Sequence, residues 1–202
     1  MSRNAEKNGQ VASELCKFGT CVSMPGDVRK IEDCKRVVKD TVDKFGSVNV
    51  LVNGAAGNFL AQASKISSNG VKTVLEIDTL GTFNMCQSVF SGYMKEHGGS
   101  IINISAALHW MGTVYQVHSS AAKAGVDAIT KTLAAEWGPY KVRVNGLVPG
   151  LIENTEGFAR LGDLSNLNSK ERSNTAFGEK RQQSSQLDQM KMKIPLQRFG
   201  TG

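Results

Sequence analysis

Short apolar segments alternate with longer amphipathic ones along most of this 202-residue chain, and this order is the strongest constraint on its fold. The apolar runs are VNVLVN at 48–53, SIINIS at 100–105 and VRVNGL at 142–147, and each has the length and the β-branched residues of a strand. Apolar residues at helical spacing occupy the stretches 31–45, 71–97 and 117–137. Strands and helices in alternation predict βαβ units, and therefore an α/β fold with a Rossmann-like, doubly wound parallel sheet.

Other segments extend this prediction to the rest of the chain. Residues 6–18 are expected to form a helix and residues 20–24 (TCVSM) a short strand, whereas the run 48–53 is typical of a strand buried on both faces. From about 162 to 193 the chain is rich in Ser, Asn, Gln and charge, which indicates a long polar insertion. We therefore expect one partial domain over residues 1–202 that carries this insertion.

Composition excludes several classes of function. The four cysteines show no CxxC spacing and no histidine cluster accompanies them, so neither a metal site nor a disulfide framework is expected. The sequence has no apolar run of about 18 residues and its first 15 residues lack a signal peptide, which predicts no membrane insertion and an intracellular location. A net charge of +6 permits small anionic ligands or a merely solvated basic surface, while an aromatic content of 6% disfavours nucleic acid.

Small or polar residues follow each predicted strand, which is where ligands bind in an open parallel sheet. Asp27 and Val28 follow the segment at 20–24, and Ser105 ends the run SIINIS. Asn53-Gly54-Ala55-Ala56-Gly57 continues from VNVLVN, and Pro149-Gly150 follows the last strand. Any one of these turns is weak evidence, because small residues are common in loops.

Taken together, in this order and spacing, the turns resemble those of the short-chain dehydrogenase/reductase superfamily. Asn53–Gly57 looks like its N-N-A-G element, Asn103–Ser105 like the serine region of its catalytic strand, and Pro149-Gly150 like its P-G turn. The segment SSAAKAG at 119–125 aligns with its Y-x-x-x-K motif. The resemblance covers residues 1–162 and 195–200, and it places Lys123 at the superfamily's lysine and Ser119 at its tyrosine.

The serine at position 119 is a departure with chemical consequences. A carbonyl reductase uses the phenol to protonate the carbonyl oxygen, and a serine hydroxyl is too weak an acid to replace it. Tyr115 lies eight residues before Lys123, where local packing is the simpler interpretation. One branch, the 2,4-dienoyl-CoA reductases of the peroxisomal type, does without that tyrosine. The segments that resemble this branch are NGAAGNFL at 53–60, IDTLGTFN at 77–84 and QVHSSAAKAGVD at 116–127.

The resemblance implies a reaction in which NADPH gives hydride to a conjugated dienoyl thioester and a proton goes to carbon. A water held by a carboxylate can deliver that proton, and Asp78 and Asp127 are the two candidates. Lys123 would hold the nicotinamide ribose, and Ser119 completes the catalytic set. The alternative for Lys123 and Asp127 is an ordinary i,i+4 salt bridge.

The resemblance also implies ligand-binding residues. Arg3 would bind the 2′-phosphate of NADPH, although a terminal arginine without that role is an equal alternative. The other residues implied for the cofactor are Asp27, Val28, Asn53, Ala55, Gly57, Pro149, Gly150 and Ile152. Those implied for the acyl-CoA substrate are Asn58, Phe59, Ser105 and Arg160. His109 and His118 flank the site in sequence, where lone histidines are more often structural.

The family's first strand and its Gly-rich phosphate loop have no counterpart in residues 1–202, nor does its last strand. We therefore expect a truncated sheet with exposed apolar edges, which favour aggregation or pairing with another chain. The resemblance predicts a homo-oligomeric, NADPH-dependent reductase that is located in the peroxisome. Without the resemblance, the expected location is the cytoplasm. The alternative is an inactive fragment, or a binding or regulatory relative.

Overall fold

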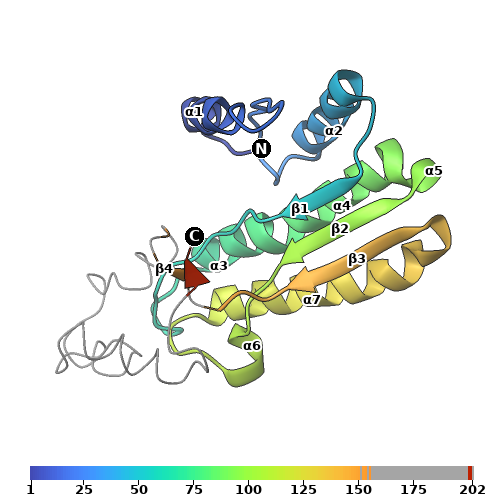
Figure 1. Ribbon diagram of the computed structural model, residues 1–202. Coiled ribbons are helices and arrows are strands. Elements are labelled where there is room, and N and C mark those ends of the chain that lie inside the picture. The colour runs from blue at the N-terminus through green and yellow to red at the C-terminus, as the bar shows by residue number, and fades with distance from the viewer. Residues whose placement is uncertain (151, 154, 156–199, 202) are drawn as a thin grey trace.

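The computed structural model describes residues 1–150, 152–153, 155 and 200–201 (Figure 1). Its main sheet has three parallel strands in the order β1 (Val50–Asn53), β2 (Gly99–Ile104) and β3 (Val142–Leu147). A second pair of short parallel strands joins β4 (Ile152–Glu153) to β5 (Gly200–Thr201). The parallel pairing confirms the predicted α/β class, and it brings the carboxyl ends of β1, β2 and β3 to one edge.

Helices connect these strands where the sequence predicts them. α2 (Ile31–Phe45) and α7 (Val117–Trp137) have the predicted bounds, and α1 (Ala5–Leu15) falls within the helix expected at 6–18 apart from its first residue. α2 ends at Gly46, whose φ of +75° is a left-handed conformation that glycine adopts without strain. A short helix, α6 (Leu108–Met111), lies between β2 and α7, and the single turn η3 (Gly138–Tyr140) leads into β3.

Residues 68–97 form one continuous helical rod made of five segments. Ser67 caps its start, since the Ser67 hydroxyl accepts a hydrogen bond of 3.1 Å from the N–H of Gly70. Two wide π-helical turns interrupt the α-helix, a feature that often occurs near functional sites. The segments are α3 (Ser68–Leu75), the π turn η1 (Glu76–Leu80), α4 (Gly81–Val89), the π turn η2 (Phe90–Met94) and α5 (Lys95–His97).

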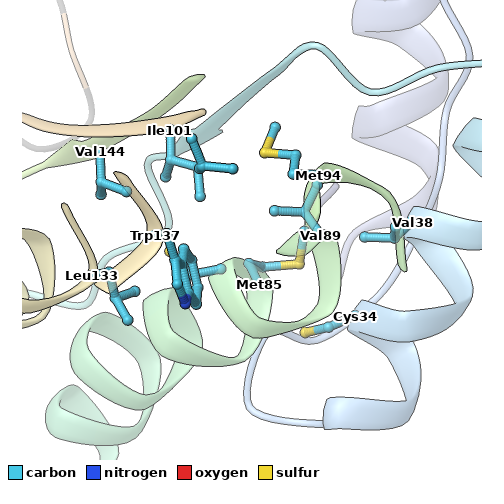
Figure 2. Packing of buried hydrophobic residues seen from close by; sticks show 11 residues of the cluster. Cys34, Val38, Met85, Val89, Met94, Ile101, Leu133, Trp137 and Val144 are labelled. Carbon is cyan, nitrogen blue, oxygen red and sulfur yellow. The ribbon is translucent and has the colours of Figure 1, made fainter. Parts of the chain in front are cut away.

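The hydrophobic core lies between one face of the sheet and the helices α2, α4 and α7 (Figure 2). Strand residues alternate between this face and the opposite one, so Ile101, Val142 and Val144 point toward the helices and are nearly inaccessible to solvent. From the helices, the cluster receives Cys34, Val38, Met85, Cys86, Val89, Met94, Leu133 and Trp137. This packing fixes the rod and α7 against the sheet, and therefore fixes the strand ends relative to both helices.

Two sequence predictions about the sheet are wrong. Val50 and Val52 are 56% and 58% exposed, so β1 is not buried on both faces. The helices α2, α4 and α7 cover only the face of the sheet opposite to these two side chains. Residues 20–24 form no strand. Within the described ranges, no strand lies beside them to supply hydrogen-bond partners, and an extended segment without a partner is not stable as a strand.

Candidate active site

Lys123 on α7 and Asp78 in η1 form an ion pair next to the carboxyl end of β2. The Lys123 Nζ lies 3.2 Å from Oδ2 of Asp78 and donates a hydrogen bond of 3.0 Å to the backbone carbonyl of Ile104, the last residue of β2. The other oxygen of Asp78, Oδ1, accepts a hydrogen bond of 2.7 Å from the N–H of Gly57. The pair thus joins the rod, α7, the end of β2 and the loop after β1.

Asp78 is nearly inaccessible to solvent, with 1% of its surface exposed. This burial raises the pKa of its carboxyl above the ordinary value of 3.8, while the Lys123 charge and the Gly57 N–H only partly oppose the effect. The result is a carboxyl group held in place by two partners and unusually easy to protonate. Such a group can deliver or accept a proton in a way that an exposed aspartate cannot.

Ser119 belongs to a hydrogen-bond network with the loop after β1. Its hydroxyl donates to Oδ1 of Asn58 over 2.7 Å, and Nδ2 of Asn58 donates to Oε1 of Gln116 over 3.0 Å. Both α7-side residues are buried, at 2% and 6% exposed respectively. The proton of Ser119 is therefore engaged in holding Asn58, which the resemblance implies to be a substrate residue. Sequence reasoning missed Gln116, because a single glutamine before a helix carries no recognisable signal.

His118 lies beneath Phe59, the residue that follows Asn58. The two rings stack with centroids 4.3 Å apart and planes inclined by 27°. His118 is completely buried, and neither ring nitrogen makes a hydrogen bond of normal geometry within the described part of the chain. Burial lowers the pKa of His118 and outweighs the opposing effects of the Phe59 backbone and the Asp78 charge, so the ring is uncharged at neutral pH.

Asp127 has a different partner from the one considered from the sequence. Its Oδ2 lies 3.2 Å from Nε2 of His109 on α6, whereas Lys123 pairs with Asp78. Among the described ion pairs, none links Lys123 to Asp127, so the i,i+4 salt bridge is not formed. Tyr115, the other acid considered, is held by its backbone, since its carbonyl accepts a hydrogen bond of 3.0 Å from the N–H of Ala61.

Asn53 and the small residues after it line a groove beside β1. Val28, Asn53, Gly54 and Ala55 contribute to this groove, whose volume is about 230 Å³. The Asn53 side chain itself points into the core, where its amide donates to Oδ1 of Asn103 over 2.9 Å and to Sγ of Cys86 over 3.2 Å. Three of the residues implied for the cofactor, Val28, Asn53 and Ala55, are thereby brought together.

Asp27 is fixed by Arg29, which sequence reasoning did not single out. The guanidinium donates to both carboxylate oxygens, over 3.0 Å from Nε and 2.6 Å from Nη2, and lowers the pKa of Asp27 to about 2. The backbone of Ser2 accepts a hydrogen bond of 3.0 Å from Gly26, which brings the neighbouring Arg3 close enough for its charge to act on Asp27. Arg3 and Asp27 therefore lie in one region, as the resemblance implies.

The remaining residues implied by the resemblance divide into three groups. Ser105 is 3% exposed, and its hydroxyl has no hydrogen-bond partner among the described residues. Pro149 and Gly150 are exposed after β3, and Ile152 begins β4. Arg160 and the insertion at 162–193 lie outside the described residues. Within the described ranges, no group of three potential metal ligands is present, and no helix combines the length and the hydropathy needed to span a bilayer.

Comparison with known families decides the classification. Residues 1–164 match the family described as short chain dehydrogenase. The chain belongs to the short-chain dehydrogenase family. A crystal structure of a short chain dehydrogenase from Bacillus anthracis superposes on it with a TM-score of 0.78 at 32% identity, covering 99% of this chain and 71% of that one.

Two curated relatives of this short-chain dehydrogenase carry the same name, peroxisomal 2,4-dienoyl-CoA reductase [(3E)-enoyl-CoA-producing]. The protein from Danio rerio is 49% identical over 163 residues, which are 80% of this chain and 54% of the relative. The protein from Arabidopsis thaliana is 49% identical over 172 residues, which are 80% of this chain and 57% of the relative. The chain therefore spans a little more than half the length of these two relatives.

Proposed function

We propose that this chain carries the catalytic part of an NADPH-dependent 2,4-dienoyl-CoA reductase. The observation that supports this function best is the buried pair of Lys123 and Asp78. In the same site, Ser119 stands where other members of the superfamily have a tyrosine. Ser119 is bound to Asn58 and is too weak an acid to protonate a carbonyl oxygen. A reaction that protonates carbon needs no phenol, and a conjugated thioester undergoes such a reaction.

The residues of the site divide the work of this reaction. A nicotinamide cofactor supplies hydride to the far end of the conjugated system when it is bound. Burial raises the pKa of Asp78 and so makes its protonated form accessible; in that form Asp78 delivers the balancing proton to carbon, directly or through a water molecule, and it is left as the carboxylate that pairs with Lys123. Lys123 keeps Asp78 oriented and contributes positive charge where negative charge collects on the thioester oxygen.

The geometry of Lys123 fits a nicotinamide ribose. An ammonium group has three N–H donors, and within the described part of the chain two of them face Ile104 and Asp78. The third is available for a ribose hydroxyl. The groove of Val28, Gly54 and Ala55 presents small or apolar surface to the rest of the cofactor, and Arg3 beside Asp27 provides the positive charge that favours NADPH over NADH.

The substrate side follows from the loop after β1. Asn58 and Phe59 contact Ser119 and His118, about one turn of α7 before Lys123, and the buried Ser105 hydroxyl lacks a partner among the described residues. A buried hydroxyl without a partner is destabilising unless a ligand or water engages it. We assign Asn58, Phe59 and Ser105 to the acyl thioester of a coenzyme A substrate, which the names of the two curated relatives also favour.

Location and assembly follow from the same relationship. The names of the relatives support a peroxisomal protein. An open groove of about 720 Å³ lies between the rod and α7, and its apolar lining supports assembly with further copies of the chain. Its larger apolar side chains are those of Leu75, Leu80, Phe83 and Ile129.

A second candidate function is binding or regulation without catalysis. The open side of β1 favours it, since β1 pairs only with β2 among the described strands and exposes Val50 and Val52. Such an edge can accept a strand from another chain. This candidate predicts complex formation with a full-length relative and no turnover.

A spectrophotometric assay distinguishes the two functions. NADPH oxidation is followed with a 2,4-dienoyl-CoA, using this chain and a form of it extended at its N-terminus. Turnover by either form, lost in the Lys123→Ala variant, supports the reductase. Equal turnover by Lys123→Ala and its parent contradicts the proposed role of Lys123, and the absence of turnover by both forms contradicts the reductase.

A further inference from the structure

Three residues of the loop after β1 contact the start of α7 or the two residues before it. The first forms hydrogen bonds with both polar atoms of its side chain, the second stacks its ring, and the third donates a backbone hydrogen bond. The contacts are those of Asn58 with Gln116 and Ser119, of Phe59 with His118, and of Ala61 with Tyr115. Such a set of contacts holds the loop in one conformation before any ligand binds.

Phe59 is the residue of this loop whose orientation matters most. One face of its ring rests on His118, yet 37% of the residue remains exposed. Gly57, two residues before it, binds the carboxylate of Asp78. The charge of Asp78 also acts on His118, so the two stacked rings lie near the pair that we assign to catalysis. A conjugated acyl group is flat, and flat π systems pack favourably against aromatic rings.

We propose that His118 is a positioning residue, whose buried ring supports Phe59 so that the exposed surface of Phe59 forms a flat wall for the conjugated acyl group. This role rests on the proposed function, because it assumes a substrate of that shape. His118 does not touch the substrate and acts through Phe59. Its uncharged state also leaves Lys123 as the cation that pairs with Asp78.

Replacing His118 by leucine separates this role from a purely structural one. Leucine fills the buried space without a flat ring, and it breaks no hydrogen bond of normal geometry, since the imidazole makes none in the described structure. In whichever form of the protein turns over the dienoyl thioester, this chain or its N-terminally extended form, His118→Leu should raise KM for the thioester about fivefold. This is the effect expected from the loss of one aromatic pair. KM for NADPH should stay within about twofold, and His118→Phe should restore KM for the thioester.

His97 provides a matched control. Its ring stacks on Tyr93 with centroids 4.1 Å apart, at the exposed far end of the rod. His97→Leu removes a histidine–aromatic stack of the same kind and should change neither KM. An unchanged KM for the thioester in His118→Leu overturns the proposal. An equal rise of both KM values also overturns it, because the whole site would then be disturbed.

A measurement without substrate keeps this proposal distinct from the proposed function. The adjacent imidazole should shift the ring protons of Phe59 in the NMR spectrum, and Phe59→Leu assigns their signals. In His118→Leu these signals should move toward the values of an unstacked phenylalanine, and in His118→Phe they should remain shifted. Unchanged Phe59 signals in His118→Leu contradict the support of Phe59, whereas absent reductase activity in the parent protein contradicts the function alone.

Discussion

The Ser119 hydroxyl donates its proton to Oδ1 of Asn58 over 2.7 Å, in a buried position at the start of α7. In a reductase that relies on a phenol, the corresponding proton would have to face the substrate. Here it is used to hold a loop. Position 119 aligns with the tyrosine that acts as an acid in the superfamily. In this protein, the Ser119 hydroxyl positions Asn58 instead of acting as an acid.

Ser119→Ala should accordingly leave kcat within about threefold of the parent value, because no chemical step uses the hydroxyl. Loss of one buried hydrogen bond should lower the free energy of unfolding by about 1 kcal/mol, measured by denaturant titration. Ser120→Ala is the control, since the buried Ser120 hydroxyl has no partner in the described structure, so its removal should leave kcat unchanged and should not lower the free energy of unfolding. A fall in kcat of about 100-fold in Ser119→Ala would assign Ser119 to the chemistry.

The two aspartates considered as proton donors are distinguished by their partners. Asp78→Asn keeps the shape of the side chain, but an amide cannot take up and release a proton, so kcat should fall by about 10²- to 10⁴-fold in the form that turns over substrate. Asp127→Asn breaks only the pair with His109 and should reduce kcat by less than about tenfold. Steady-state kinetics of both variants decide the assignment, and the reverse order of effects would transfer the role to Asp127.

The pair of Asp27 and Arg29 predicts a specific dependence of stability on pH. Because Arg29 lowers the pKa of Asp27 from 3.8 to about 2, the folded state binds this proton more weakly than the unfolded state does. The stabilisation is complete above pH 3.8 and is lost as the pH falls from there toward about 2. Arg29 is about one-third exposed, so we expect ~1 kcal/mol rather than the full value of the shift. Denaturant titrations at several pH values should show a shallower acid slope in Asp27→Asn.

Thiol reactivity should divide the four cysteines into two pairs. Burial raises the pKa of Cys34 to about 11 and that of Cys86 to about 12, so neither forms the reactive thiolate at neutral pH. Cys16 is exposed and Cys21 half-buried. A thiol reagent should modify these two in the native protein, and the other two only after denaturation. Rapid modification of Cys86 without unfolding would contradict the packing around β1.

At Gly125, α7 packs closely against the rod. A Cβ atom at this position would lie 2.7 Å from Cγ2 of Thr79, whose hydroxyl is already bonded to the carbonyl of Ala122. Gly125→Ala should therefore destabilise the protein by about 1–3 kcal/mol. Gly9→Ala, in open space on α1, should instead leave stability unchanged or raise it by up to about 1 kcal/mol. Thermal denaturation of both variants tests this difference in sign.

Periodicity and glycine placement were sufficient to predict α2 and α7 but not the short helix α6, whereas strand predictions succeeded only where a neighbour exists. The bounds of α2 and α7 follow from local signals, such as Gly46 after the first and the start of β3 after the second. Residues 20–24 have the composition of a strand, but a strand also needs a partner that is remote in sequence. The exposure of Val50 and Val52 is likewise a property of what packs nearby, which apolar composition does not encode.

In the site, the family resemblance grouped Lys123, Asp78 and Asn58 but did not assign their partners. Both aspartates lie at positions compatible with Lys123, one by helical spacing and one by resemblance. Only the three-dimensional arrangement shows that the lysine reaches Asp78, because its Nζ is also drawn to the end of β2. The stacking of Phe59 on His118 joins residues 59 positions apart, and no local pattern indicates it.

The π turn η1 explains how one helix can meet two sets of neighbours. A wide turn takes up an extra residue, which rotates the helix beyond it by roughly 100° relative to the part before it. Val74 before the turn and Met85 after it are both buried, and Asp78 within the turn meets Lys123. Deleting a single residue from Glu76–Leu80 would make the rod a continuous α-helix from Ser68 to Val89, which is out of phase with either the core or the ammonium group. The length of this five-residue segment thus determines whether the rod can bury its core residues and also direct Asp78 toward Lys123.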